Sequence, residues 1–254
     1  MSGLSLYRGF TRIAMPMARL LLRRRLAKGK EDGARIGERE GIASLVRPDG
    51  PVAWLHAASV GEAQSALVLI ERLLLENPDL KMLVTTGTVT SASHLKDRLP
   101  DRSFHQYLPL DCPQWVKRFL NHWKPDLAIW MESELWPNLV TATIRRNIPA
   151  LLVNARMSAS SLRIWQRMGG MAKKLISGFS LCLAQTEDQV ARLRKLGAMN
   201  ISCVGNLKYS AAPLAVYEPD LEALQCEIGT RPVWVAASTH DGEEVLVSNA
   251  HTAL

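Results

Sequence analysis

The chain has 254 residues, of which 47% are hydrophobic and 22% are charged. This composition is ordinary for a soluble globular core and excludes a disordered or fibrous protein. The net charge is +7, but the first thirty residues carry +8 and contain no acid, so the remainder carries −1. The positive charge is therefore confined to an N-terminal arm, which argues against a general nucleic-acid-binding surface.

The arm, residues 1–30, has the pattern of an amphipathic helix. At about 100° per residue, four arginines fall on one face and the large apolar residues on the opposite face. The arginines are Arg8, Arg12, Arg19 and Arg23, and the apolar residues are Leu6, Phe10, Ile13, Met17, Leu20 and Leu21. The pattern predicts a helix that lies on a membrane, because no apolar stretch reaches the roughly 20 residues needed to span one and no cleavage site marks a signal peptide. The alternative is a helix that docks on the core with solvated arginines, and Pro16 predicts a kink in either case.

From Pro51 onward, short apolar runs alternate with helical periods, a pattern typical of βαβ units and a parallel sheet. The predicted fold class is α/β, with a Rossmann-like parallel sheet in a domain spanning residues 31–205. Strands are expected near Val52–His56, Met82–Thr86, Phe104–Leu108, Leu127–Met131, Ala150–Asn154, Leu181–Ala184 and Ile201–Val204. Helix starts are predicted at the capping box Thr186–Gln189 and at Cys112-Pro113.

The pattern changes after Gly205. Residues 206–232 are predicted to be an interdomain linker, and Val233–Ala237 to be the first strand of a second α/β domain. A helix is expected to follow, beginning near Asp241-Gly242-Glu243-Glu244. Residues 233–254 are too few to bury a core of their own. The chain is therefore expected to contain only the start of that second domain.

Acidic residues follow two of the predicted strands. Glu62 comes after the first strand, and Glu132 and Glu134 come after the fourth. In an open α/β sheet, ligands bind beyond the carboxyl ends of the strands, so an acid at that edge is a candidate general base. The competing interpretation is structural, because Ser59 and Glu62 also fit a capping box and Ser133 could cap the next helix.

Other polar motifs narrow the possible functions. The turn Thr86-Gly87-Thr88 lacks the lysine of a P-loop and the glycine spacing of a dinucleotide fold, which disfavours an NTPase or a dehydrogenase. Its hydroxyls would suit the sugar or phosphate of an acceptor. The four cysteines stand far apart, without the spacing of metal ligands or of a disulfide framework, which indicates a reducing, cytosolic compartment.

Seven motifs in this order resemble those of the 3-deoxy-D-manno-octulosonic acid (Kdo) transferases of lipopolysaccharide synthesis. They are His56-Ala57-Ala58-Ser59-Val60-Gly61-Glu62, Thr85-Thr86-Gly87-Thr88, Pro109-Leu110-Asp111, Glu132-Ser133-Glu134-Leu135-Trp136-Pro137-Asn138, Asn154-Ala155-Arg156-Met157-Ser158, Gly205-Asn206-Leu207-Lys208 and Ala237-Ser238-Thr239-His240. The resemblance runs from about Gly29 to Glu244. Each motif alone is weak, but the ordered set is specific.

The resemblance implies the N-terminal domain of a GT-B glycosyltransferase that moves Kdo from CMP-Kdo to a hydroxyl of a lipid A precursor, with inversion. It also implies that the protein acts at the cytoplasmic face of the bacterial inner membrane and that it needs no bound metal, no cofactor and no nucleic acid. The sequence departs from the family pattern at two places. After Ser158 the family tends to show a basic residue before the next serine, whereas this chain reads Ala159-Ser160-Ser161, and Ser210 stands where an acid is common. Two alternatives stay open, namely a non-catalytic fragment that binds the lipid A precursor and a GT-B transferase that uses another sugar nucleotide.

The resemblance also assigns roles to residues. Glu62 is the expected base, supported by Glu132 or Glu134. The residues expected to bind the acceptor are Ser59, Gly61, Thr86, Gly87, Thr88, Asn154 and Arg156. Those expected to bind the donor are Lys208, Ser238, Thr239, His240 and Glu243, because a helix start with hydroxyls and a cation suits a phosphate. For Ser238–His240, a plain helix-capping turn is the alternative.

Overall fold

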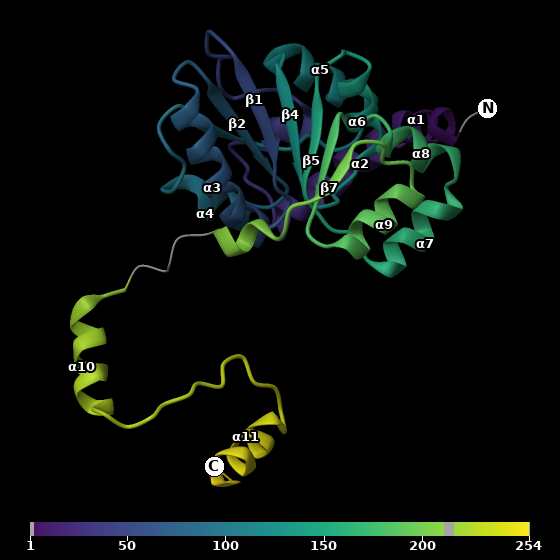
Figure 1. Ribbon diagram of the computed structural model, residues 1–254. Helices are drawn as coiled ribbons and strands as arrows, with labels where there is room; N and C mark the ends of the chain where they lie inside the picture. The colour runs from purple at the N-terminus through teal and green to yellow at the C-terminus, as the bar shows by residue number, and fades with distance from the viewer. Residues whose placement is uncertain (1–2, 211–215, 254) are drawn as a thin grey trace. The chain divides into compact units, whose positions relative to one another are not determined.

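A computed structural model describes residues 3–210 and 216–253, and the chain divides into two compact units, Met1–Ala211 and Ala212–Leu254. The first unit contains a parallel sheet with helices on both faces (Figure 1). Its strands are β1 (Val52–His56), β2 (Lys81–Thr86), β3 (Ser103–Tyr107), β4 (Leu127–Met131), β5 (Ala150–Ala155), β6 (Leu181–Ala184) and β7 (Ile201–Cys203). All seven predicted strands are confirmed, with each end within one residue of its expected position.

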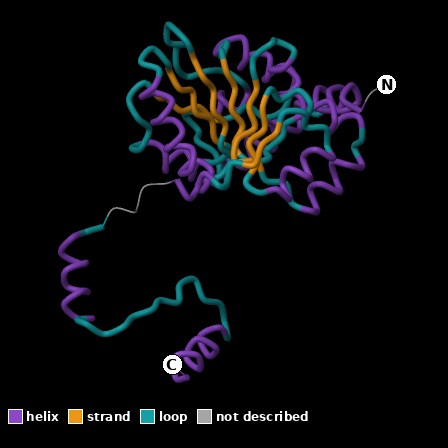
Figure 2. Tube along the Cα trace, in the orientation of Figure 1, coloured by secondary structure: helices purple, strands orange, loops and turns teal. Residues whose placement is uncertain are grey.

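The strand order is β3-β2-β1-β4-β5-β6-β7, and every neighbouring pair is parallel. Figure 2 shows the strands lying side by side between layers of helices. The chain order reverses between β1 and β4, which is the topological switch point of a doubly wound sheet. Ligand-binding residues are therefore expected after β1 and β4.

Successive side chains of each strand enter two separate cores, as a strand with both faces covered requires. In β1, Trp54 packs on one face and Leu55 on the other, and in β4 the same alternation applies to Trp130 and Met131. The helices of the first unit that follow the arm are α3 (Val60–Glu76), α4 (Val89–Lys96), α5 (Pro113–Trp123), α6 (Pro137–Ile144), α7 (Ala159–Arg167), α8 (Gly170–Ile176) and α9 (Glu187–Lys195), with the 3-10 helices η1 (Ile36–Glu40) and η2 (Leu207–Ser210). The predicted helix starts at Cys112-Pro113 and Thr186 are confirmed.

The arm forms two helices, α1 (Gly3–Ile13) and α2 (Met15–Ala27), with Pro16 in the first turn of the second. The predicted kink is therefore present, because proline cannot donate the hydrogen bond that would continue one straight helix. Both helices belong to the first unit. Leu4 and Tyr7 pack against the main core, and Leu22 is buried beside Trp115.

Large apolar residues of the arm remain exposed. They are Leu26 and the six residues of the predicted apolar face, which we call the apolar row: Leu6, Phe10, Ile13, Met17, Leu20 and Leu21. Phe10 is 70% exposed and Ile13 is 82% exposed. None of the helices in the described part of the chain is both long and apolar enough to cross a membrane. One face of the arm thus packs on the core, as the core-docking alternative predicted. The apolar row forms a second apolar face, which remains exposed.

The second unit contains α10 (Glu218–Ile228) and α11 (Glu243–Ala253). The helix expected to begin within Asp241–Glu244 is confirmed and begins at Glu243. The predicted strand Val233–Ala237 is wrong, because these residues form an irregular segment that pairs with no other part of the described chain, and a strand needs a partner for its backbone groups. The predicted linker 206–232 contains η2 and α10, and its residues 211–215 lie outside the described residues.

Candidate active site

The carboxylate of Glu62 lies at the switch point, on the first turn of α3. Ser59 is the N-cap of this helix, and its hydroxyl oxygen accepts a hydrogen bond from the Glu62 N–H (3.2 Å). In return, the Glu62 carboxylate accepts bonds from the Ala58 N–H (2.8 Å) and the Ser59 hydroxyl (3.0 Å). The capping interpretation is therefore present in this structure, and it holds the carboxylate in one orientation at the strand end.

The environment of Glu62 favours a base. Burial raises the pKa of its carboxyl above the ordinary value of 4.5, and the negative charge of Glu132 acts in the same direction. The hydrogen bonds from Ala58 and Ser59 oppose this shift without reversing it. A carboxylate with a raised pKa is a better proton acceptor near neutral pH than an ordinary one.

Glu132 faces Glu62 from the other side of the switch point, immediately after β4. Its backbone φ is +53°, in the left-handed region that non-glycine residues seldom adopt. Its Oε1 lies 3.6 Å from Nζ of Lys208, and a Cβ added to Gly61 would lie 3.8 Å from the same nitrogen. Lys208 therefore lies between the two sides of the site, paired with Glu132 and within van der Waals distance of the position that a Gly61 Cβ would occupy.

Glu134 pairs with His56, a residue of the first family motif for which no role was predicted. Nε2 of the fully buried His56 lies 2.8 Å from the Glu134 carboxylate, and the indole N–H of Trp136 donates a hydrogen bond to the same carboxylate (3.1 Å). Burial works against ionisation of Glu134, but these hydrogen bonds and the His56 charge lower its pKa below 4.5. Glu62 and Glu134 are thus shifted in opposite directions, a difference that can separate a base from a permanent anion.

The predicted acceptor residues on the β2 side have internal partners. The Thr86 hydroxyl is hydrogen-bonded to His105 Nε2 (2.9 Å), and Thr88 is the N-cap of α4, accepting from the Ser91 N–H (3.1 Å). Gly87 lies next to the β1–α3 turn, because an added Cβ would be 3.8 Å from the Ala58 carbonyl oxygen. This turn therefore borders the Glu62 turn, although its two hydroxyls already have structural roles.

Asn154 and Arg156 belong to the end of β5 and the turn after it. Asn154 is buried with a left-handed φ of +54°, and its Oδ1 accepts from the Leu207 N–H (3.0 Å). This bond ties the segment that carries Lys208 to the sheet. The Arg156 carbonyl accepts a hydrogen bond from the Ser133 hydroxyl, while its guanidinium group is bonded to no other described residue. Ser133 thus joins the β4 and β5 turns and does not cap a helix.

The remaining predicted donor residues lie in the second unit. The Thr239 hydroxyl donates to Glu244 (2.7 Å), and the His240 N–H donates to Glu243 (2.8 Å). Ser238 has a left-handed φ of +59°. In this structure the segment has the contacts of a turn that caps α11, which was the alternative interpretation. Within residues 3–210 and 216–253, no group of three His, Cys, Asp or Glu side chains is arranged like metal ligands.

The first unit has a seven-stranded doubly wound sheet with carboxylates on both sides of its switch point. It therefore has the fold of the Rossmann-like N-terminal domain of a GT-B protein. A solved structure of this fold, the Anabaena protein HepE in complex with UDP, superposes with a TM-score of 0.50 at 14% identity, covering 80% of this chain and 58% of that one. At this identity the likeness shows the fold alone.

A model of the family described as 3-deoxy-D-manno-octulosonic-acid transferase (kdotransferase) matches residues 34–211. This chain belongs to that family. The 3-deoxy-D-manno-octulosonic acid transferase of Rickettsia bellii is 36% identical over 95% of the chain and 58% of the relative, and that of Haemophilus influenzae is 37% identical over 87% and 52%. The chain spans little more than half the length of these relatives.

Proposed function

We propose that this chain forms the acceptor side of a transferase that moves Kdo from CMP-Kdo to a hydroxyl of a lipid A precursor, with Glu62 as the general base. The observation that carries the proposal is the half-buried Glu62 carboxylate at the switch point, with its raised pKa and with Glu132 as its charged neighbour. Membership of the Kdo transferase family supports the choice of sugar.

In the proposed reaction, Glu62 takes the proton of the acceptor hydroxyl. The hydroxyl oxygen forms a bond to the anomeric carbon of Kdo while the bond between that carbon and the CMP phosphate oxygen breaks, and the electron pair leaves with CMP. Attack and departure on opposite faces invert the configuration, as in other inverting glycosyl transfers that use one base. The carboxylates on the two sides of the switch point would hold the hydroxyl near Glu62, with Glu132 paired to Lys208.

The proposed ligand contacts follow the family resemblance. Ser59, Gly61, Thr86, Gly87, Thr88, Asn154 and Arg156 would line the acceptor side. The free guanidinium group of Arg156 supports contact with a phosphate or sugar oxygen. Lys208, Ser238, Thr239, His240 and Glu243 would serve the donor. For Lys208, release from Glu132 would supply the positive charge that a departing CMP phosphate needs.

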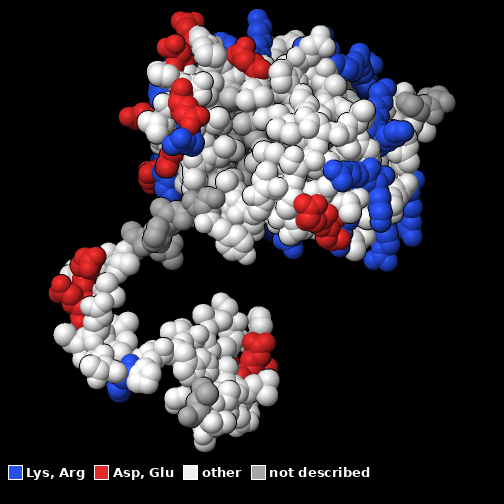
Figure 3. Space-filling model, viewed as in Figure 1, with Lys and Arg blue, Asp and Glu red and all other residues white. Residues whose placement is uncertain are grey.

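We further propose that the arm holds the protein on the cytoplasmic face of the inner membrane, where a lipid acceptor is found. The exposed apolar row supports this proposal, because large uncovered apolar patches mark interaction surfaces. Figure 3 shows lysine and arginine side chains gathered along the side of the first unit where α1 lies. Anionic lipid head groups attract such charges.

The decisive experiment measures Kdo transfer from CMP-Kdo to a tetra-acylated lipid A precursor in detergent. It compares the chain, a chain extended with the C-terminal remainder of the Rickettsia bellii relative, and Glu62→Gln in the extended form. We expect transfer by the extended protein, little or none by the chain alone, and a loss of about 100-fold or more in the variant. Full activity of Glu62→Gln would reduce Glu62 to a helix cap.

Two further readouts separate the alternatives. Competition by UDP rather than CMP would indicate another sugar nucleotide. Binding of the lipid A precursor by the extended protein, with neither CMP binding nor transfer, would indicate a non-catalytic lipid-binding protein.

A further inference from the structure

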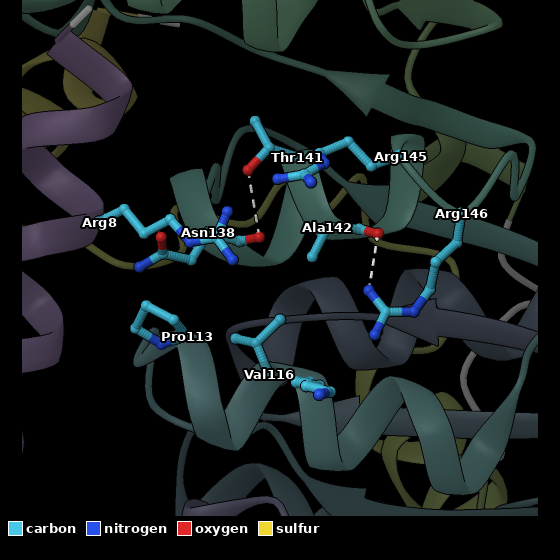
Figure 4. A pocket seen from close by; sticks show the side chains of 9 residues that line it. Arg8, Pro113, Val116, Asn138, Thr141, Ala142, Arg145 and Arg146 are labelled. Carbon is cyan, nitrogen blue, oxygen red and sulfur yellow. Dashed lines mark hydrogen bonds between the residues drawn. The ribbon is translucent and has the colours of Figure 1, made fainter. Parts of the chain in front are cut away.

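A cavity of about 320 Å³ lies between α1, α5 and α6, away from Glu62, Glu132 and Glu134 (Figure 4). Its size falls at the lower end of the roughly 300–1,000 Å³ of ligand pockets. Four of the nine lining residues are cations and none is an acid: Arg8, Lys117, Arg145 and Arg146 stand with Pro113, Val116, Asn138, Thr141 and Ala142. A second cavity of about 350 Å³ shares Arg8, Asn138, Thr141 and Arg145 and adds Lys174.

The positive charges of the cavity are not neutralised within the described part of the chain. The side chains of Arg8, Lys117 and Arg145 make no hydrogen bond or ion pair with any described residue. Arg146 donates only to neutral acceptors, the Ala142 carbonyl (3.1 Å) and Asn121 Oδ1 (2.9 Å). Its pKa is lowered first by burial and then by the neighbouring charge of Arg145. The four cations are exposed, so water and salt weaken their mutual repulsion, and an anion bound in the hollow would lower it further.

The walls of the cavity are held in place by buried and partly buried polar contacts. Next to Arg8, the Tyr7 hydroxyl donates to Asp111 (3.0 Å). Asn138, which lines the cavity, donates through Nδ2 to the Thr11 hydroxyl (2.9 Å) and to the Asp111 carbonyl (2.6 Å). α1 is therefore fixed on α6, and the cations of three separate elements face one preformed hollow.

We propose that this cavity binds the phosphate group of a phosphorylated ligand. The forked guanidinium groups of Arg8 and Arg145 match the oxygens of a phosphate, and Lys117 adds a point charge. Arg8 is two residues from both Leu6 and Phe10, so it lies about 160° around α1 from each of them. The cavity thus opens on a different side of the helix from the apolar row, and the proposal is independent of the proposed transfer reaction.

The test uses calorimetric titration of the 254-residue chain with inorganic phosphate and with glycerol 3-phosphate, at constant ionic strength in chloride. We expect Arg145→Gln and Arg8→Gln each to weaken binding about ten-fold, as expected for the loss of a charged hydrogen-bond partner. The matched control is Arg194→Gln on α9, which removes the same charge from an exposed arginine outside the cavity. Absence of phosphate binding, or equal weakening in all three variants, would overturn the proposal.

Vesicles then identify the source of the phosphate group. Phosphatidylglycerol vesicles that displace bound inorganic phosphate, where phosphatidylcholine vesicles do not, would identify a lipid head group. Failure of both to displace it, while glycerol 3-phosphate does, would identify a soluble phosphate ester.

Discussion

The Tyr7 hydroxyl donates a 3.0 Å hydrogen bond to the carboxylate of Asp111, a residue 104 positions further along the chain. The same carboxylate accepts from the backbone N–H groups of Asn138 (2.9 Å) and Leu139 (2.8 Å), so it caps α6 as well. One buried side chain therefore fastens the N-terminal arm and starts the helix that follows Glu132 and Glu134.

Removal of this carboxylate should be costly. Asp111→Ala leaves the first-turn donors of α6 and the Tyr7 hydroxyl unpaired, and we expect the free energy of unfolding to fall by about 3 kcal/mol. Tyr7→Phe deletes one bond only and should lower it by about 1 kcal/mol. Urea unfolding measures both changes, and equal effects of the two variants would contradict the shared role of Asp111.

Gly41 should tolerate no side chain. Its φ is +75°, and an added Cβ would lie 2.2 Å from the carbonyl oxygen of Trp115. Gly41→Ala should therefore lower the free energy of unfolding by more than about 3 kcal/mol, since both backbone strain and overlap arise. Gly29→Ala is the matched control, because Gly29 has a φ of +66° with open space around it, and should cost only about 1 kcal/mol. Similar losses of stability in the two variants would show that backbone strain, and not overlap with Trp115, determines the cost.

The His56–Glu134 pair should appear in the pH dependence of stability. The pKa of Glu134 is lower in the folded protein than its ordinary 4.5, so its carboxylate stabilises the fold above pH 4.5, and this stabilisation is lost as the pH falls through the lowered value. Glu134→Gln should therefore cost most stability above pH 4.5 and progressively less below it. Urea unfolding from pH 3 to 6.5 measures this, and parallel curves would contradict it.

The two roles of Glu62 should separate by substitution. Glu62→Ala removes the acceptor for Ala58 N–H and Ser59 hydroxyl and should lower the free energy of unfolding by about 1 kcal/mol. Glu62→Gln keeps an amide oxygen that can accept one of these bonds and should cost less. In the extended protein, both variants should lose transfer alike. An active Glu62→Gln variant beside an inactive Glu62→Ala variant would assign the defect to the fold.

The apolar row should be the surface through which the protein binds vesicles. Phe10→Ser removes an exposed side chain whose burial in lipid is worth roughly 1.5–3 kcal/mol, so vesicle binding should weaken about ten-fold or more without loss of stability. Val46→Ser is the control, because Val46 is 88% exposed but lies outside the arm. Cosedimentation with phosphatidylglycerol vesicles measures both. Equal weakening would show that the arm is not the contact surface.

The sheet could be predicted closely because its strands are short, continuous apolar runs with helical periods between them. The meeting of Glu62 and Glu132 followed from the same information, since parallel strands end at one edge. His56–Glu134 and Tyr7–Asp111 could not be predicted, because each joins residues far apart in the chain and neither leaves a local pattern. Val233–Ala237 has the local pattern of a strand, but no strand in the described chain lies beside it to form the backbone hydrogen bonds of a sheet.

The position of β1 inside the sheet, between β2 and β4, has a consequence for synthesis on the ribosome. Residues 52–107 can pair as β1, β2 and β3 as soon as they emerge, but the other edge of β1 must wait for Leu127–Met131. During that interval the nascent chain presents an apolar strand with an unpaired edge, the feature that invites association with other chains. The emergence of residues 108–131 is thus one period in which the growing protein needs protection from such association.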